Sequence, residues 1–304
     1  MNGWQRWLQA PQTHWLRKLL FQLHLWLGIG FGLYVLAISL SGSALLLKYR
    51  MYEWFEPKYL QQEPAADAVP LEGDALMTRM AEVYAGYELG FTIEASNRTD
   101  ATYIVLGRDG EYFPHYFDQF SGLDRGPANP WPIKAMDWTA DIHDDLLFNR
   151  TGRRINGVGG ALFVVMSITG LIIWWQGRIR WYEGLVILPN SKRAFMWQLH
   201  SVVGFWSLLL MLAWGVSGFQ LGFPEVVDRF VSWLDTNPAD ETRPLASTLR
   251  FFRTVHFARI GETELTRWAW IVVSFIPTLI LVSGFILWWR RVVRRWLKRT
   301  PAVA

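Results

Sequence analysis

Residues 19–47 read LLFQLHLWLGIGFGLYVLAISLSGSALLL, a run that contains no Asp, Glu, Lys or Arg. A helix needs roughly 20 apolar residues to cross about 30 Å of hydrocarbon. The run therefore predicts a membrane-spanning helix. It is too long for the apolar part of a signal peptide, which favours a retained anchor over a cleaved leader. Three later apolar runs, at residues 156–175, 196–221 and 268–289, predict three further spans.

The composition of the whole chain agrees with a membrane protein. Of its 304 residues, 51% are apolar and only 18% are charged, a balance that soluble chains seldom show. Cysteine is absent, which excludes disulfides, iron–sulfur clusters, thiolate zinc sites and cysteine nucleophiles. The net charge of +4 does not indicate nucleic acid, because the basic residues gather beside the apolar runs.

The distribution of charge predicts the orientation of the spans. Segments 1–18, 177–195 and 290–304 together hold 13 of the 30 Lys and Arg residues and one of the 26 Asp and Glu residues. By the positive-inside rule these segments face the cytoplasm, and residues 48–155 and 222–267 lie outside. We therefore expect a multi-pass protein in the lipid bilayer with both termini cytoplasmic.

The first external segment is long enough for a small domain. Its pattern predicts a helix at 70–85 and strands at 91–94, 102–106 and 112–117, with turn residues at 107–110 and 120–126. Residues 57–70 resemble a linker, and the second external segment predicts surface helices around 226–234 and 249–257. The expected divisions are a tail with the first span (1–50), the external domain (51–135), an interfacial helix with the second span (136–177), a cytoplasmic loop (178–195), the third span (196–222), the second external segment (223–267) and the fourth span with a basic tail (268–304).

An internal repeat relates the two halves of the chain. When residues 22–42 are aligned with residues 198–218, Gln22-Leu23-His24 matches Gln198-Leu199-His200, Gly28 matches Gly204, and Ser41-Gly42 matches Ser217-Gly218. The ends of the second and fourth spans, 169–175 and 283–289, are also alike. The repeat predicts an all-α membrane fold of four helices, built as two parallel two-span units, with a small α+β domain between the first and second spans.

The repeat places histidines in pairs. His24 and His200 lie about two turns inside the cytoplasmic ends of the first and third spans. On the external side, His143 precedes Gly170 of the second span, and His256 precedes Gly284 of the fourth, at nearly equal separations. Two facing imidazoles can bind the two axial positions of a haem iron, which predicts two haem b groups. The alternative for any single histidine is an interfacial or buried hydrogen-bonding role.

Two arginines and two glycines accompany the first histidine pair. Arg17 and Arg193 each precede a histidine by seven residues on the same helical face, where a guanidinium could meet a haem propionate. Their simpler role is that of positive-inside anchors. Gly28 and Gly204 follow the histidines by four residues, where a missing side chain would let a porphyrin lie close or let two helices pack.

These stretches resemble the PepSY-associated transmembrane helix family, which includes bacterial iron-regulated membrane proteins and ferric-siderophore reductases. The resemblance is carried by residues 20–28, 40–42, 142–147, 168–174 and 197–200, and residues 117–122 look like the end of a PepSY fold. It implies a bacterial inner-membrane protein whose external PepSY-like domain is periplasmic. It also implies haem-bearing members that carry electrons across the inner membrane to reduce ferric siderophores.

The sequence therefore predicts a di-haem b oxidoreductase, with His24, His200, His143 and His256 as iron ligands and Arg17 and Arg193 at the cofactor. We expect electrons to pass from a cytoplasmic reductase or quinol to a periplasmic acceptor of the ferric-siderophore type. The loop 177–195 is too short to fold a flavin or nicotinamide domain, so the donor is separate. Two alternatives stay open: a non-redox PepSY anchor that binds a protein or peptide partner, and a b-type cytochrome that oxidises quinol.

Overall fold

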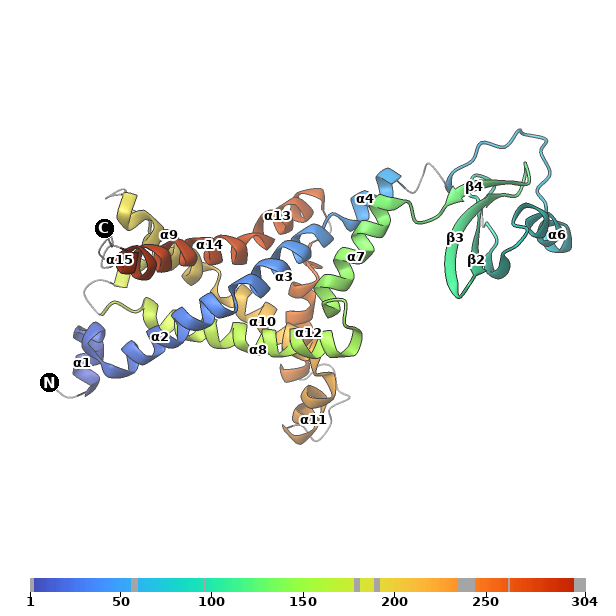
Figure 1. Ribbon diagram of the computed structural model, residues 1–304. Helices are drawn as coiled ribbons and strands as arrows, with labels where there is room; N and C mark the ends of the chain where they lie inside the picture. The colour runs from blue at the N-terminus through green and yellow to red at the C-terminus, as the bar shows by residue number, and fades with distance from the viewer. Residues whose placement is uncertain are drawn as a thin grey trace, which may run out of the picture. The chain divides into compact units, whose positions relative to one another are not determined.

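The computed structural model describes residues 3–55, 60–95, 97–177, 181–188, 192–234, 244–261 and 263–297. The chain divides into two compact units. Unit 1 comprises residues 1–46 and 140–304 and is helical, and unit 2 comprises residues 47–139 and contains the sheet (Figure 1). Each unit is described by itself below.

Unit 1 contains the apolar runs as helices. Two helices are long and apolar enough to cross a membrane: α8 (Asn149–Trp174), and the stretch Glu264–Leu297 that includes α13 (Glu264–Ser274) and α14 (Ile276–Trp288). The other two predicted spans are bent pairs. Helices α2 (Trp15–Gly30) and α3 (Gly32–Leu45) meet at 60°, and α9 (Lys192–Trp206) and α10 (Leu208–Gly222) are bent in the same way. The described residues thus hold two spans, or four if each bent pair is one span.

The two bends fall at equivalent places in the chain. One break is at Phe31 and the other is at Ser207, which match each other in the alignment of the repeat, and the second bend measures 64°. Gly30 and Gly32 flank the first break, and sharp kinks are common where glycine or serine interrupts a helix. Hydropathy alone predicts unbroken runs, because it responds to side chains and not to the backbone.

Glycines bring α8 and α10 into close contact in unit 1. A Cβ added to Gly160 would lie 2.5 Å from the backbone N of Phe219 and 2.6 Å from the carbonyl O of Gly215. A Cβ added to Gly222 would overlap the Cα of Gly157. Small residues let helices approach in a bilayer, so this pair forms a tight seam in the bundle.

Short helices complete the ends of unit 1. Near the N-terminus are α1 (Gly3–Gln9) and the 3-10 turn Pro11–Thr13; a 3-10 turn at Trp181–Gly184 follows α8. After α14 come a π-helical turn, Trp289–Val293, and α15 (Arg294–Leu297). The two predicted surface helices are α11 (Pro224–Leu234) and α12 (Pro244–His256). In Figure 1, α12 and the end of α7 (Trp131–Asp145) lie at the end of unit 1 away from α1 and α15.

Unit 2 is a four-stranded antiparallel sheet in the order β1-β2-β3-β4. The strands are β1 (Glu88–Ile93), β2 (Thr102–Arg108), β3 (Glu111–Asp118) and β4 (Leu123–Pro127), and the helices are α4 (Lys48–Phe55) and α6 (Gly73–Val83). Leu76 and Met80 of α6 pack with Ile104, Leu106 and Phe117 to form the core. This arrangement agrees with the predicted helix and the first three strands.

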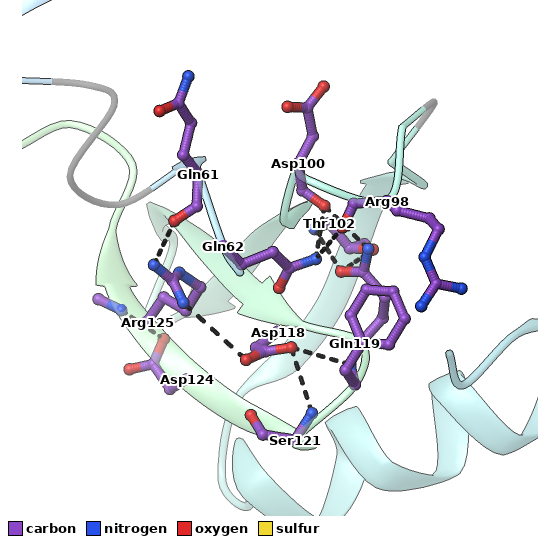
Figure 2. Close-up of polar contacts among 12 residues, drawn as sticks. Gln61, Gln62, Arg98, Asp100, Thr102, Asp118, Gln119, Ser121, Asp124 and Arg125 are labelled. Atoms are coloured by element: carbon purple, nitrogen blue, oxygen red, sulfur yellow. Dashed lines mark hydrogen bonds and ion pairs between the residues drawn. The ribbon is translucent and has the colours of Figure 1, made fainter. Parts of the chain in front are cut away.

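Strand β4 was not predicted, because residues 120–126 were interpreted as a turn. Its sequence, LDRGP, has no apolar alternation, and it pairs only with β3 at the edge of the sheet. Figure 2 shows the polar contacts that support this side of unit 2, where the guanidinium of Arg125 contacts the carbonyl O of Gln61 and the carboxylate of Asp118.

The predicted linker 57–70 is partly a structural element. Residues 57–59 lie outside the described residues. The carbonyl O of Leu60 accepts a hydrogen bond from the backbone N–H of Ala101, and the amide of Gln62 donates to the carbonyl O of Asp100 at 2.7 Å (Figure 2). The start of this segment is therefore tied to the sheet.

Candidate cofactor site

The first histidine pair lies between two of the bent segments of unit 1. His24 is in α2 and His200 is in α9, and their ring centres are 6.3 Å apart. Both side chains line one large cavity. The structure thus brings together two residues from the two halves of the chain, as the repeat predicted.

The second pair comes from the short helices at the other end of unit 1. His143 is in the last turn of α7, His256 is the last residue of α12, and their ring centres are 6.1 Å apart. Asn156 of α8 holds the backbone of α7 here, since its amide donates to the carbonyl O of His143 at 2.8 Å. The two pairs therefore have closely similar spacings on different elements.

Every one of the four rings is hydrogen-bonded at Nδ1 to a serine or threonine on another helix. The Nδ1–Oγ distances are 3.0 Å from His24 to Thr169, 3.1 Å from His200 to Ser283, 3.3 Å from His143 to Ser41 and 2.8 Å from His256 to Ser217. Three rings also make a hydrogen bond to the backbone: His200 to Ile280 and His143 to Ile38, both at 3.0 Å, and His24 to Met166. Every one of the four hydroxyl contacts is thus made at Nδ1.

The hydrogen-bonding partners of the rings bear on which ring nitrogen carries the proton. Each donates to a carbonyl one turn back in its own helix: Ser41 to Ala37 at 2.7 Å, Thr169 to Val165 at 2.8 Å, Ser217 to Ala213 at 2.6 Å and Ser283 to Ile280 at 2.9 Å. While its single hydrogen is given to that carbonyl, the hydroxyl oxygen is an acceptor for the histidine. The carbonyl groups of Ile280 and Ile38 can only accept, so Nδ1 of His200 and of His143 carries the proton and Nε2 of these two rings keeps its lone pair.

A glycine follows each of these hydroxyl residues in the sequence, and three of the four glycines make room for a histidine ring. A Cβ added to Gly42 would lie 2.7 Å from Cε1 of His143, and one on Gly284 would lie 3.1 Å from Cε1 of His200. At Gly170 the distance to Cε1 of His24 is 3.3 Å. Gly218 differs, because its nearest neighbour is the Cα of Gly160 at 3.6 Å.

The role of these hydroxyl residues was not predicted from the sequence. The dipeptide Ser-Gly or Thr-Gly recurs four times in the repeat, once on each span, and each copy contributes one hydrogen bond to one histidine. The pattern was visible as part of the repeat. Its pairing with a histidine on a different helix could not be read from the sequence, because the partners are 39 to 145 residues apart.

The cavity around His24 and His200 has a volume of about 1640 Å³. Gly28 and Gly204 both line it; a Cβ on Gly204 would meet nothing within 4 Å, and one on Gly28 would meet only Cε of Met166, at 3.5 Å. These two glycines therefore keep space open beside the histidines. Gly28 also faces Met166 of α8, so the helix-packing interpretation holds for Gly28 together with the cavity, whereas Gly204 faces open space.

One of the two predicted arginines reaches the cavity. Arg17 lines it, and its Nη2 donates to the carbonyl O of Ile173 at 2.6 Å. The side chain of Arg193 lies outside the described residues. Four further arginines that were not predicted also line the cavity, namely Arg290, Arg291, Arg294 and Arg295.

Burial keeps the second pair uncharged. Burial lowers the pKa of His143, and burial together with the neighbouring His143 ring lowers the pKa of His256 to about 4. Both rings are therefore neutral at pH 7, which is the form that binds metals. The neighbouring carboxylate of Asp144 acts in the opposite direction on the pKa of His143 but does not outweigh burial, and it pairs with Arg153 at 2.6 Å.

The spacing of the rings fits one iron between each pair. Two imidazoles that bind a metal ion from opposite sides, each through a metal–nitrogen bond of about 2 Å, bring their ring centres to about 6 Å. The described residues contain no cluster of three or more His, Cys, Asp or Glu that could hold a metal ion. Each pair supplies two donors, so a planar macrocycle that carries its own four nitrogen ligands matches the donor set.

The comparison with known families agrees with the resemblance carried by the sequence. No curated protein matches the chain. A family model described as the PepSY-associated TM region matches residues 21–246, about three quarters of the chain, including nearly all of the first span, all of the third and three of the four histidines. The chain is therefore a membrane protein that belongs to the PepSY-associated TM region family.

Proposed function

We propose that this protein is a di-haem b oxidoreductase of the bacterial inner membrane. In this proposal the bent pairs α2–α3 and α9–α10 are single spans, and the two halves are parallel two-span repeats with both termini cytoplasmic. Unit 2 is then periplasmic. The orientation rests on the basic segments, and the repeat is supported by the equivalent positions of the two bends.

The observation that carries the proposal is the repeated geometry of the four histidines. Two ring pairs have centres 6.3 Å and 6.1 Å apart, and each ring has its Nδ1 hydrogen-bonded to a hydroxyl of another helix. Hydrogen bonds of this kind fix the tautomer and orientation of a metal-binding imidazole. A hydrogen-bonding role alone would not require four imidazoles in two close pairs.

The residues present define what this chain contributes to the reaction. When bound, haem supplies one-electron chemistry between ferric and ferrous iron. His24 and His200 would hold one group near the cytoplasmic side, and His143 with His256 would hold the other near the periplasmic side. The apolar helices exclude water around both, so that electrons pass without any ion entering the hydrocarbon.

The proposed acceptor is a periplasmic ferric chelate of the siderophore type, and the proposed donor is a cytoplasmic reductase or quinol. Reduction transfers one electron to Fe(III) and yields Fe(II), which the chelating oxygens bind more weakly than Fe(III). Protein reduced beforehand should be reoxidised by a ferric hydroxamate, with one Fe(II) captured by a ferrous chelator for each electron lost. Unchanged reduced spectra would contradict the assignment of the acceptor and favour quinol oxidation.

The absorption spectrum of the purified protein tests the proposal itself. We expect a Soret band and reducible α bands, with two irons per chain, when the protein is made in cells supplied with a haem precursor. His24→Ala and His200→Ala should each remove the same haem, and His143→Ala and His256→Ala should remove the other. His115→Ala in unit 2 is the matched control and should retain both. A colourless protein would contradict the proposal and favour a non-redox anchor.

A further inference from the structure

The wall of the large cavity carries three buried N–H groups that have no acceptor. Nε of Arg17, Nε2 of Gln176 and Nε1 of Trp288 are buried and make no hydrogen bond among the described residues. All three residues line the cavity that contains His24 and His200. A buried donor without a partner costs stability, so three of them in one wall indicate a ligand that accepts hydrogen bonds.

The three donors come from separate parts of the chain. Arg17 is in the first turn of α2, Gln176 follows the end of α8, and Trp288 is the last residue of α14. The contact between Nη2 of Arg17 and the carbonyl O of Ile173 ties the start of α2 to the end of α8 and leaves Nε free. In Figure 1 these helix ends lie at the same end of unit 1, beside α1 and α15.

A ligand bound to the histidines would extend to these donors. Gly170 and Gly284 contact the rings of His24 and His200, and Gln176 and Trp288 follow these glycines by six and four residues. Arg17 precedes His24 by seven residues, about two turns of the same helix. The donors and the histidine pair therefore belong to one binding site.

The charge around the donors selects an anion. Lys18 and the four arginines of the π-turn and α15 line the cavity with Arg17, and no Asp or Glu is among the described residues that line it. At the other end of unit 1 two arginines have acidic partners, since Arg153 pairs with Asp144 at 2.6 Å and Arg150 with Glu225 at 3.8 Å. The π-helical turn Trp289–Val293 adds to this assignment, because such turns are frequent at functional sites.

We propose that Arg17, Gln176 and Trp288 form a carboxylate-binding subsite, hereafter the donor cluster, for the two propionates of the porphyrin held by His24 and His200. The inference rests on the proposed function. Carboxylates match three N–H donors and a cationic wall, and hydrogen bonds between charged groups are the strong ones. The donor cluster orients the macrocycle in its plane, with its acidic edge towards α15, and discriminates against porphyrins without free acids.

A comparison of the affinities for haem and for its dimethyl ester separates the contribution of this subsite from that of iron ligation by the histidines. The His256→Ala variant, made without haem, retains only the site of His24 and His200 and is titrated with iron protoporphyrin IX and with its dimethyl ester, following the Soret band. We expect the free acid to bind about 10–100-fold more tightly, because the ester removes charge-assisted hydrogen bonds. In the same background, Trp288→Phe and Arg17→Met should each reduce this ratio several-fold.

Trp175 provides a matched control. Its Nε1 is also buried without a partner, but Trp175 does not line the cavity. Trp175→Phe should therefore leave the ratio of the two affinities unchanged. If Trp288→Phe does not fold, as judged by circular dichroism, Gln176→Leu tests the same cluster by the same ratio.

The outcomes separate the subsite from the proposed function. Binding of neither porphyrin would overturn both. Equal binding of acid and ester to the His256→Ala protein would leave haem ligation standing and overturn the donor cluster. Loss of co-purified phospholipid phosphate in Trp288→Phe, with an unchanged ratio, would also overturn it, because the bound anion would then be a lipid headgroup.

Discussion

At the scale of single residues, the site depends on a hydroxyl that is hydrogen-bonded to Nδ1 of each imidazole. A histidine alone can carry its proton on either nitrogen, and only one form presents Nε2 as a donor to a metal. Ser217 is fully buried, its hydroxyl is committed to the carbonyl O of Ala213, and its oxygen accepts from His256 at 2.8 Å. A hydroxyl of this kind orients a ring without adding a charge to an apolar bundle.

Ser217→Ala should be the most damaging of the hydroxyl deletions. His256 has no other hydrogen-bond partner among the described residues, whereas His200 keeps the carbonyl O of Ile280 at 3.0 Å when Ser283 is replaced. We expect the affinity for the haem of the His143–His256 pair to fall about 10–100-fold, as when other metal ligands lose the hydrogen bond behind them. Its midpoint potential should rise, because a less basic imidazole stabilises ferric iron less.

Spectroelectrochemical titration of the purified variants measures both effects. Ser43→Ala is the matched control, since Ser43 is buried two residues from Ser41 but its hydroxyl donates only to the carbonyl O of Ser39. Equal potentials in the Ser217→Ala and Ser43→Ala proteins would show that the hydroxyl does not act on the ligand.

At the scale of elements, the bundle depends on close backbone contact in one place and on open space in another. Gly160 lies against the backbone of α10, whereas a Cβ on Gly30 would meet nothing within 4 Å. The bends at Phe31 and Ser207 interrupt α2–α3 and α9–α10 beside Gly28 and Gly204, which line the cavity. Straight helices with larger residues at these positions would pack together and fill the space.

Gly160→Ala should destabilise unit 1, because its Cβ would lie 2.5 Å from the backbone N of Phe219 and backbone cannot rotate away. Overpacking of this kind costs about 1–3 kcal/mol. Thermal unfolding in detergent, followed by circular dichroism, measures the change. Gly30→Ala makes the same chemical change in open space and should have little effect; equal losses would show that α8 and α10 do not pack as described.

The edge strand of unit 2 should show an acid-sensitive stability. Burial by itself would raise the pKa of Asp124, but hydrogen bonds from His115, from the backbone N–H of Gly126 and from Tyr84 hold it below its ordinary value. A lowered folded-state pKa stabilises the fold above the unfolded value of about 3.9, and this contribution is lost as the pH falls through the folded pKa. The contacts of β4 with β3 should therefore weaken on acidification below about pH 4.

Hydrogen exchange of peptides covering residues 111–127 tests this in the whole chain, after correction for the intrinsic rates. The unaltered protein should lose protection as the pH falls below about 4, through the lowered pKa of Asp124. Asp124→Asn should be less protected at neutral pH and should lack this step. The same acid step in both proteins would assign the effect to another group.

At the scale of the whole molecule, the proposed function requires the two histidine pairs to face opposite sides of the membrane. The absence of cysteine makes this testable with single introduced thiols. Ala65→Cys in unit 2 should react with a membrane-impermeant maleimide in intact spheroplasts, and Tyr182→Cys should react only after lysis. The reverse pattern would place unit 2 in the cytoplasm and contradict reduction of an external chelate.

Much of this organisation follows from the order of residues along the chain. The apolar runs, the internal repeat and the pairing of His24 with His200 are readable because hydropathy and spacing are local properties that recur along the sequence. Strand β4 cannot be read from the sequence, because this edge strand contains glycine and proline and shows no alternation of apolar and polar residues.

The tertiary structure decided the rest. The hydroxyl that holds each ring, the open space beside Gly204 and the placement of Arg17, Gln176 and Trp288 in one cavity wall each combine residues from different helices. Such contacts depend on how backbones bend and how far they approach, and neither quantity is encoded in the hydropathy of any single segment. The sequence determined which residues recur in both halves of the chain. Packing determined which residues of other helices contact each of them.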